Sequence, residues 1–294
     1  MEICSFNNLS EEQKGKIYRL VSNSNNHYSF QSFDDMLGFY GGIVLDNGKS
    51  HFSLWEGDEL IGALGVISKN AGIRGEIFLV GLNISKPHSD ALNLLLVKAF
   101  DYCSGIRNAS YKLGITPDMA FLTPAIIKND FKEVYRNLEM KYCGNFGTLP
   151  SDMQEHFENI SSSNLKQLQD VHNRAFLLSP NGAAIEDEEL EEFLGEYSGN
   201  PELAGVYFEE GKAAGIYILK MEKNVGWIEG IAVYPQRWGK GIGKKLLLKS
   251  VQVLKEARAE EIKLTVFDVN KNAVKLYLDN GFVIEREHSI WYER

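Results

Sequence analysis

Three glycines at alternate positions mark the stretch of sequence with the clearest potential for chemistry. Gly239, Gly241 and Gly243 follow an apolar run that reads as a strand, and they open a segment with helical spacing. Glycine lets a backbone approach a ligand closely, and the first N–H groups of a helix have no partner inside the helix. The arrangement therefore predicts an anion site made of backbone N–H groups.

Two familiar phosphate-binding patterns do not fit this turn. A Walker A loop needs glycine where Trp238 stands and serine or threonine where Lys245 stands. A Rossmann fingerprint needs the spacing G-x-G-x-x-G, whereas this chain has G-x-G-x-G. A glycine-rich turn that serves only as a connector is the plain structural alternative.

A carboxylate on the preceding strand adds to the candidate site. Glu229 lies inside the apolar segment WIEGIAV, where a charged residue is unusual. Alternation along a strand places Glu229, Ile231 and Val233 on one face. A role in catalysis or binding would explain a charged residue at such a position.

The segment IAVYPQRWGKGIGKKLL resembles the acyl-CoA-binding motif of the GNAT superfamily of N-acyltransferases. Val233 and Pro235 match its V-x-P, and Gly241 and Gly243 match the last two positions of (Q/R)-x-x-G-x-(G/A). Trp238 stands where the family usually has Gln or Arg. That departure changes one side chain beside the pyrophosphate and leaves the backbone N–H sites intact.

A second family motif begins 29 residues after Gly241, in the segment NKNAVKLYLDNGF. Two independent motifs in the family's order make the resemblance specific over about residues 155–294, whereas over residues 50–145 it is only an outline. The pattern N-x-x-A-x-x-(L/F)-Y-x-x-x-G-F is matched at Asn270, Ala273, Leu276, Tyr277, Gly281 and Phe282.

The resemblance implies that the two central strands splay apart and hold the pantetheine of CoA. The backbone at Ile231 and Val233 would bond the pantetheine amides, and one of these N–H groups could stabilise the thioester oxyanion. Lys240 and Lys244 would add positive charge beside the pyrophosphate, whereas Lys245 can be an ordinary solvated residue of the helix. Asn270 would contact CoA, and it can also cap the helix that follows it. The residues implied to bind acyl-CoA are Ile231, Ala232, Val233, Trp238, Gly239, Lys240, Gly241, Ile242, Gly243, Lys244, Asn270 and Tyr277.

The resemblance also implies two catalytic residues. Tyr277 is the candidate general acid that protonates the departing CoA thiolate, and the plain alternative is an ordinary buried tyrosine. Because a protonated amine is not a nucleophile, a base or a water chain must take its proton. Many family members carry a catalytic glutamate at the place of Glu229, which makes it the candidate base, acting directly or through water. The alternative is that this carboxylate only binds the acceptor amine.

The two halves of the chain repeat one order of expected strands and helices. GLNISKP (81–87) aligns with GIAVYPQ (230–236), and EVYRNLEM (133–140) aligns with KLYLDNGF (275–282), which places Tyr135 opposite Tyr277. We therefore expect an α/β protein of two tandem GNAT-like domains, each a mostly antiparallel mixed sheet flanked by helices. Residues 1–150 form a degenerate copy that lacks the glycine turn and is not expected to bind CoA. Residues 151–294 form the catalytic domain.

Two further expectations concern the junction between the halves. The segment 123–144 opens with Thr-Pro and has helical spacing, which predicts a helix. Only 12 residues follow Phe282, which is short for the last two strands of a complete domain. We expect the first half, near GNFGTLP (144–150), to complete the second sheet.

Composition and charge disfavour several classes of function. The 294 residues carry a net charge of −9, which argues against nucleic acid as the main partner. No apolar run reaches 18 residues and no signal peptide is visible, so a membrane partner is not expected and a cytoplasmic location follows by default. Three cysteines without a C-x-x-C disfavour a disulfide framework or a zinc site. The histidines have no metal-ligand spacing, so no metal is expected.

Residues 151–215 hold 3 basic and 14 acidic residues, a net charge of −11. The plain interpretation is a solvated helix face, and the functional one is a negative rim that attracts a cationic substrate. We expect an N-acetyltransferase that uses acetyl-CoA and acts on a small-molecule amine. The alternative is a non-catalytic acyl-CoA-binding sensor or scaffold. The role of the first half stays open between a scaffold, a wall of the acceptor site and the surface of a homodimer.

Overall fold

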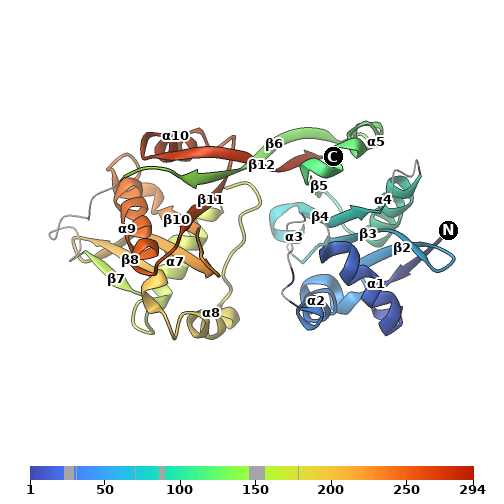
Figure 1. Ribbon diagram of the computed structural model, residues 1–294, viewed down its shortest axis with the longest axis horizontal. Coiled ribbons are helices and arrows are strands. Elements are labelled where there is room, and N and C mark those ends of the chain that lie inside the picture. Colours follow the sequence, from blue (N-terminus) through green and yellow to red (C-terminus); the bar gives the residue numbers. More distant parts are fainter. Residues whose placement is uncertain (23–29, 31, 70, 86–89, 146–155, 178) are drawn as a thin grey trace. The chain divides into compact units, whose positions relative to one another are not determined.

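The computed structural model describes residues 1–22, 30, 32–69, 71–85, 90–145, 156–177 and 179–294. The chain divides into two compact units (Figure 1). Unit 1 comprises Met1–Arg136 and His288–Arg294, and unit 2 comprises Asn137–Glu287. The division lies inside a strand, whereas the sequence places the boundary near residue 150.

Unit 1 is a sheet with helices on both faces. Its strand order is β1-β2-β3-β4-β5-β12, with β4 and β5 parallel and the other neighbours antiparallel. One core cluster packs α4 on the sheet, and a second packs α1 and α2 on the opposite face. The strands are β1 Glu2–Ser5, β2 His51–Glu56, β3 Glu59–Ile67, β4 Glu76–Ile84, β5 Ser110–Ile115 and the end of β12 Phe282–Glu293; the helices are α1 Glu11–Ser22, α2 Phe33–Tyr40, α3 Ala71–Arg74, α4 Ala91–Tyr102 and α5 Thr123–Lys128, with short 3-10 helices at Phe6–Asn8, Ile43–Gly48 and Pro117–Leu122.

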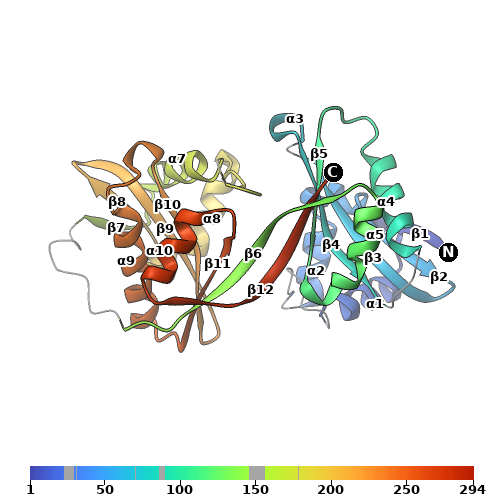
Figure 2. The ribbon, with the colours of Figure 1, turned by 90° about the horizontal axis from the view of Figure 1, so that it is seen from above.

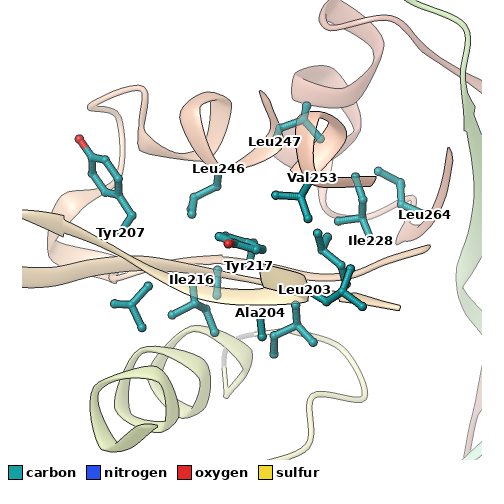
Figure 3. Packing of buried hydrophobic residues seen from close by; sticks show 14 of the residues in the cluster. Leu203, Ala204, Tyr207, Ile216, Tyr217, Ile228, Leu246, Leu247, Val253 and Leu264 are labelled. Carbon is teal, nitrogen blue, oxygen red and sulfur yellow. The ribbon is translucent and has the colours of Figure 1, made fainter. Parts of the chain in front are cut away.

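Unit 2 repeats this plan with the strand order β6-β11-β10-β9-β8-β7, in which β10 and β11 are parallel. Leu246, Leu247 and Val253 of α9 pack on one face of the strands, and α7 covers the other face (Figure 3). The described helices include none that is long and apolar enough to cross a membrane. The strands are β6 Lys132–Tyr142, β7 Phe157–Asn159, β8 Ala204–Glu209, β9 Lys212–Glu222, β10 Val225–Val233 and β11 Glu261–Phe267; the helices are α7 Leu165–Phe176, α8 Leu190–Glu196, α9 Ile242–Glu256 and α10 Lys271–Asp279, with short 3-10 helices at Asp187–Glu189, Pro201–Leu203 and Pro235–Arg237.

Each sheet is completed by a strand from the other half of the chain. Residues 137–141 of β6 pair antiparallel with β11, and residues 290–293 of β12 pair antiparallel with β5. Both strands run from one unit into the other (Figure 2). The expectation that the first half completes the second sheet is therefore confirmed. The strand that does so is β6, whereas residues 146–150 of GNFGTLP lie outside the described part of the chain.

The predicted helix over residues 123–144 is wrong for most of its length. α5 ends at Lys128, the backbone turns at Asp130 with a φ of 64°, and β6 begins at Lys132. The segment is rich in Glu, Lys, Arg, Leu and Met, which favour helices locally. Pairing with β11, which is more than 120 residues away in the sequence, overrides that preference.

The structure also corrects the alignment of the two halves. The turn after α5 matches the turn after α10, because the amides of Asn129 and Asn280 each donate to a carbonyl four residues earlier, at 2.8 and 2.7 Å. In both turns the next residue has a positive φ, and the one after it is a buried phenylalanine. The counterpart of Tyr277 is therefore Ile126. The predicted equivalence with Tyr135 is wrong, because Tyr135 lies in β6.

A buried carboxylate holds the last strands of unit 2 together. Glu139 of β6, whose side chain is 2% exposed, accepts hydrogen bonds from Arg286 at 2.7 Å and from Lys263 at 3.1 Å. Burial alone would raise the pKa of Glu139, but the bonds from Arg286 and Lys263 outweigh burial and leave that pKa lowered. The three residues come from β6, β11 and β12, so this cluster joins a strand of the first half to two strands of the second.

We predict that Glu139→Gln lowers the free energy of unfolding at neutral pH by about 3 kcal/mol, because it removes the charge that balances two nearby cations in a buried place. Urea denaturation of the full chain measures this. Glu133→Gln is the control, since Glu133 pairs with Arg136 at 2.7 Å on the surface and such pairs contribute less than about 1 kcal/mol.

The cost of Glu139→Gln should shrink as the pH falls through the lowered pKa of Glu139, because the natural side chain then loses its charge as well. Equal costs for the two variants at neutral pH would contradict this account of the cluster.

Candidate active site

The parallel pair at the centre of unit 2 separates after a short ladder. β10 and β11 pair over four residues, ending at Ile228 opposite Leu264, although both strands continue beyond that pair. The register of β10 against β9 shifts between Ile228 and Gly230, so Glu229 is the extra residue of a β-bulge. The expected splay is confirmed, and it leaves a gap between the ends of the two strands.

The glycine turn connects β10 to α9 at one end of this gap. Gly239 and Gly241 have φ angles of 79° and 76°, in the left-handed region that other residues avoid. Gly241 is the N-cap of α9, and the Lys245 N–H donates to the Gly241 carbonyl at 3.2 Å. The N–H groups of residues 242–244 have no acceptor inside the helix. This is the geometry that an anion site at a helix start requires.

The gap and the turn line one cleft of about 870 Å³. Its walls come from the end of α7, the end of β10, the glycine turn, the start of α9 and one side of α10 with the residues just before it. Two of the predicted site residues, Glu229 and Lys240, are not among those that line it. The predicted residues that line the cleft are Ile231, Ala232, Val233, Trp238, Gly239, Gly241, Ile242, Gly243, Lys244, Asn270 and Tyr277.

The sequence analysis did not identify one wall of the cleft. Ala175 and Phe176 are the last residues of α7, Ser179 and Pro180 come shortly after the helix, and no motif marks any of them. They reach the cleft because α7 packs across β9 and β10, which is a tertiary contact with no local signal. Arg237 also lines the cleft, but an ion pair with Glu209 at 2.9 Å ties its guanidinium to the end of β8.

The ring nitrogen of Trp238 is hydrogen-bonded to the backbone, whereas much of the ring is exposed. The indole N–H donates to the Val233 carbonyl at 2.8 Å, while the side chain is 57% exposed. The bond fixes the ring beside the glycine turn and uses a carbonyl at the end of β10. Where the family usually has a Gln or Arg side chain, this chain therefore presents an aromatic ring to the cleft.

Tyr277 lies in α10 and lines the cleft together with the end of β10. The side chain of Asn270 accepts a bond from the Ala273 N–H at 3.2 Å, which caps α10 as expected. Tyr277 is 9% exposed, and burial raises the pKa of its hydroxyl to about 12. The hydroxyl therefore keeps its proton throughout the neutral range and can act as an acid there.

Glu229 lies at the bulge and is exposed. The surrounding protein partly desolvates its carboxyl, which raises the pKa of that group. The positive charge of Lys220 lowers the pKa, whereas the negative charges of Glu222 and Glu196 raise it further. Burial alternates along β10, which agrees with the predicted shared face of Glu229, Ile231 and Val233. Ile231 and Val233 line the cleft, and Glu229 does not.

The side chains of Lys245 and His172 have structural partners. The Lys245 ammonium donates to the Tyr207 hydroxyl at 2.8 Å, which places it against the sheet. His172 stacks on Phe176 with ring centroids 4.5 Å apart, and burial lowers the pKa of its imidazole. The described residues contain no group of three or more His, Cys, Asp or Glu side chains that could hold a metal ion.

Residues 165–282 match the family model described as "Acetyltransferase (GNAT) family". The matched region begins with α7 and ends where β12 begins, so it contains the whole cleft. No curated protein matches the chain.

Solved structures with the same fold cover the whole chain. A GCN5-related N-acetyltransferase from Sphaerobacter thermophilus aligns over 100% of this chain and 95% of its own, at 15% identity and a TM-score of 0.72. A GNAT-family acetyltransferase from Colwellia psychrerythraea aligns over 100% and 99%, at 13% identity and a TM-score of 0.58. A tandem GNAT protein from the clavulanic acid biosynthesis pathway aligns over 100% and 98%, at 9% identity and a TM-score of 0.65. At these identities the likeness establishes the fold.

Proposed function

Because its residues 165–282 belong to the GNAT family of acetyltransferases and its whole length has the tandem GNAT fold, we propose that this chain is an N-acetyltransferase. It moves an acetyl group from acetyl-CoA to a primary amine within a ternary complex, without a covalent enzyme intermediate. The amine nitrogen bonds to the thioester carbonyl carbon, the carbon–sulfur bond breaks, and the thiolate leaves. The observation that carries this proposal is the cleft where β10 and β11 separate, with a helix start at one end and Tyr277 in its wall.

The shape of the cleft supports a bound acyl-CoA in one orientation. The pyrophosphate lies at the glycine turn, where the N–H groups of residues 239–244 donate to it and Lys240 and Lys244 add positive charge. The pantetheine lies along Ile231 and Val233, where β10 has no partner strand on the β11 side. Trp238 offers no charge to the phosphates, so their binding depends on the backbone and the two lysines.

We predict that Gly241→Ala weakens the binding of acetyl-CoA at least tenfold. A side chain at a φ of 76° costs about 1–2 kcal/mol, so the start of α9 shifts and its N–H groups lose their alignment. Isothermal titration calorimetry measures the change.

Gly211→Ala is the matched control. Gly211 has a φ of 72° in the turn between β8 and β9, and a Cβ there or at Gly241 would meet no described atom within 4 Å. Both variants therefore introduce the same backbone strain, but only Gly241→Ala should affect the ligand. Equal affinities for acetyl-CoA in the two variants would exclude the glycine turn as its site.

Tyr277 is the general acid of the proposed reaction. It lines the cleft, and its pKa of about 12 keeps the hydroxyl protonated when the thiolate leaves. The proton moves from this hydroxyl to the CoA sulfur, and solvent then restores it.

We predict that Tyr277→Phe lowers kcat about 100-fold and leaves the KM for acetyl-CoA nearly unchanged, because the ring stays and only the proton donor is lost. Steady-state kinetics measure both constants. Tyr207→Phe, which removes a hydroxyl bonded to Lys245 outside the cleft, should keep the natural kcat. A Tyr277→Phe enzyme with unchanged kcat would show that the hydroxyl donates no proton in a step that limits the rate.

Glu229 is the base that takes a proton from the acceptor amine. It lies at the point where the strands separate, outside the cleft lining, so a water molecule can relay the proton. The raised pKa of Glu229 is closer to the pKa of an amine than the pKa of an ordinary glutamate is.

We predict that kcat of the natural enzyme rises with pH as Glu229 loses its proton, and that this acid limb is absent in Glu229→Gln, whose kcat falls about 100-fold. Glu222→Gln is the control, because removing that neighbouring negative charge should move the limb to lower pH and keep it. A Glu229→Gln enzyme with a higher KM for the amine and an unchanged kcat would show that the carboxylate only binds the acceptor.

We propose a small cationic amine as the acceptor. The acidic residues of the segment 186–196 are exposed, and Glu196 at the end of α8 lies close enough to raise the pKa of Glu229. A negative field beside the proposed base attracts an amine with additional positive charge.

The experiment that tests the function measures thiol release from acetyl-CoA with a panel of amines. Release with polyamines or amino sugars, and little with amines that carry carboxylates, is the expected result. Release only with anionic amines would overturn the acceptor class. Tight binding of acetyl-CoA without release by any amine would favour the other candidate, a non-catalytic acyl-CoA sensor or scaffold.

A further inference from the structure

Unit 1 contains a second cleft, of about 410 Å³, at the place that corresponds to the cleft of unit 2. β4 and β5 pair over four residues, ending at Leu79 opposite Leu113, and both strands continue beyond that pair. The cleft lies where β4 ends, between α1 and the turn that follows β5. α1 packs on β3 and β4 as α7 packs on β9 and β10. The splayed gap is therefore present in both copies of the fold.

The groups proposed for acyl transfer are absent from this second cleft. Ile126 takes the place of Tyr277, and Val80 takes the place of Glu229. The segment after Ser85 has no glycine turn in the sequence, and its residues 86–89 lie outside the described ranges. A cleft of this size without these groups suits a smaller ligand and no acetyl transfer.

A buried amide lies in this cleft where unit 2 has an alanine. Asn83 corresponds to Ala232, lines the cleft and is 1% exposed. Its neighbours Leu82 and Ile84 belong to the core cluster on the α4 face, so alternation directs Asn83 to the face that α1 covers. Its Nδ2 has no hydrogen-bond partner among the described residues. A buried donor without an acceptor is costly, and a ligand oxygen would satisfy it.

Charges of both signs lie around the same cleft. Arg19 and Lys16 project from neighbouring turns of α1, and Asp118 lies on the other side, in the turn after β5. Arg19 uses its Nε to donate to the Gly15 carbonyl at 3.3 Å, and Lys16 pairs with Glu12 at 3.2 Å. Within the described part of the chain no ion pair joins Asp118 to either cation. The cleft thus holds a cation and an anion that do not neutralise each other.

We propose that this cleft binds a small α-amino acid. The guanidinium of Arg19 pairs with the carboxylate of the ligand, and Lys16 adds positive charge beside it. The carboxylate of Asp118 pairs with the ammonium of the ligand, and Asn83 donates to a ligand oxygen inside the cleft. The site is separate from the proposed acetyltransferase cleft of unit 2 and does not depend on that function.

The test is a calorimetric titration of the full chain with each of the twenty amino acids in the presence of saturating acetyl-CoA. Acetate and succinate, which lack an amine, and ethylamine, which lacks a carboxylate, are the comparison ligands. We expect one amino acid or a small group of similar ones to bind with a stoichiometry of one per chain, and the comparison ligands to bind at least tenfold more weakly.

Variants on the surface of the cleft identify the site. Arg19→Gln and Asp118→Asn should each weaken the binding at least tenfold. Lys14→Gln is the matched control on the same helix, since Lys14 pairs with Glu11 away from the cleft, and it should leave the affinity unchanged. Asn83→Ala, which copies the residue of unit 2, should also weaken binding. The midpoint temperature of thermal unfolding of Asn83→Ala should equal or exceed that of the natural chain, because the substitution removes a buried donor without an acceptor.

Three results would overturn the proposal. The first is that none of the twenty amino acids binds. The second is that Arg19→Gln and Asp118→Asn bind as the natural chain does, which would place the amino acid elsewhere, for example as an acceptor in unit 2. The third is that acetate or succinate binds as tightly as the amino acid, which would make the cleft a simple anion site.

Discussion

The hydrogen-bonded ladder between β10 and β11 ends at Ile228 and Leu264, and the rest of the site depends on that ending. The extra residue Glu229 shifts β10 against β9 at the same point, so the strand bends away from β11. A ladder that continued would close the gap and leave no place for a ligand between the strands. The bulge opens the gap and carries the proposed base, and the same strand leads into the glycine turn.

The same constraint explains how one fold can hold two different proposed sites. Unit 1 also has a short parallel ladder and a cleft beyond its end, but its side chains differ at the positions that matter. Ile126 replaces the hydroxyl of Tyr277, and Asn83 replaces the methyl of Ala232. The backbone architecture provides a cleft in each unit, and the side chains decide what each cleft can do.

Local signals in the sequence were sufficient for the glycine turn, the start of α9 and the cap of α10 at Asn270. Each depends on backbone conformation or on a contact within four residues, as the left-handed φ of Gly241 shows. The strand β6 was not predictable in this way, because good helix formers surround Glu139 and only distant pairing with β11 makes them a strand. The error in aligning Tyr135 with Tyr277 follows from that one misassigned element.

Two features of the candidate site lay beyond the sequence for a similar reason. Phe176 enters the cleft through the packing of α7 on the sheet, which no local pattern reports. The register shift at Glu229 depends on the pairing of β10 with β9, and no local pattern in the sequence reports that extra residue. Sequence motifs identified the backbone groups that are proposed to bind acetyl-CoA, whereas the positions of the side chains required the tertiary structure.

The number of acetyl-CoA molecules bound per chain tests the central claim most directly. A single proposed backbone site at the start of α9, whose glycine turn has no match in the sequence of unit 1, predicts a stoichiometry of one in a calorimetric titration of the natural protein. A stoichiometry of two would show that unit 1 also holds acyl-CoA without a glycine turn. No binding at all would contradict the assignment of the cleft in unit 2.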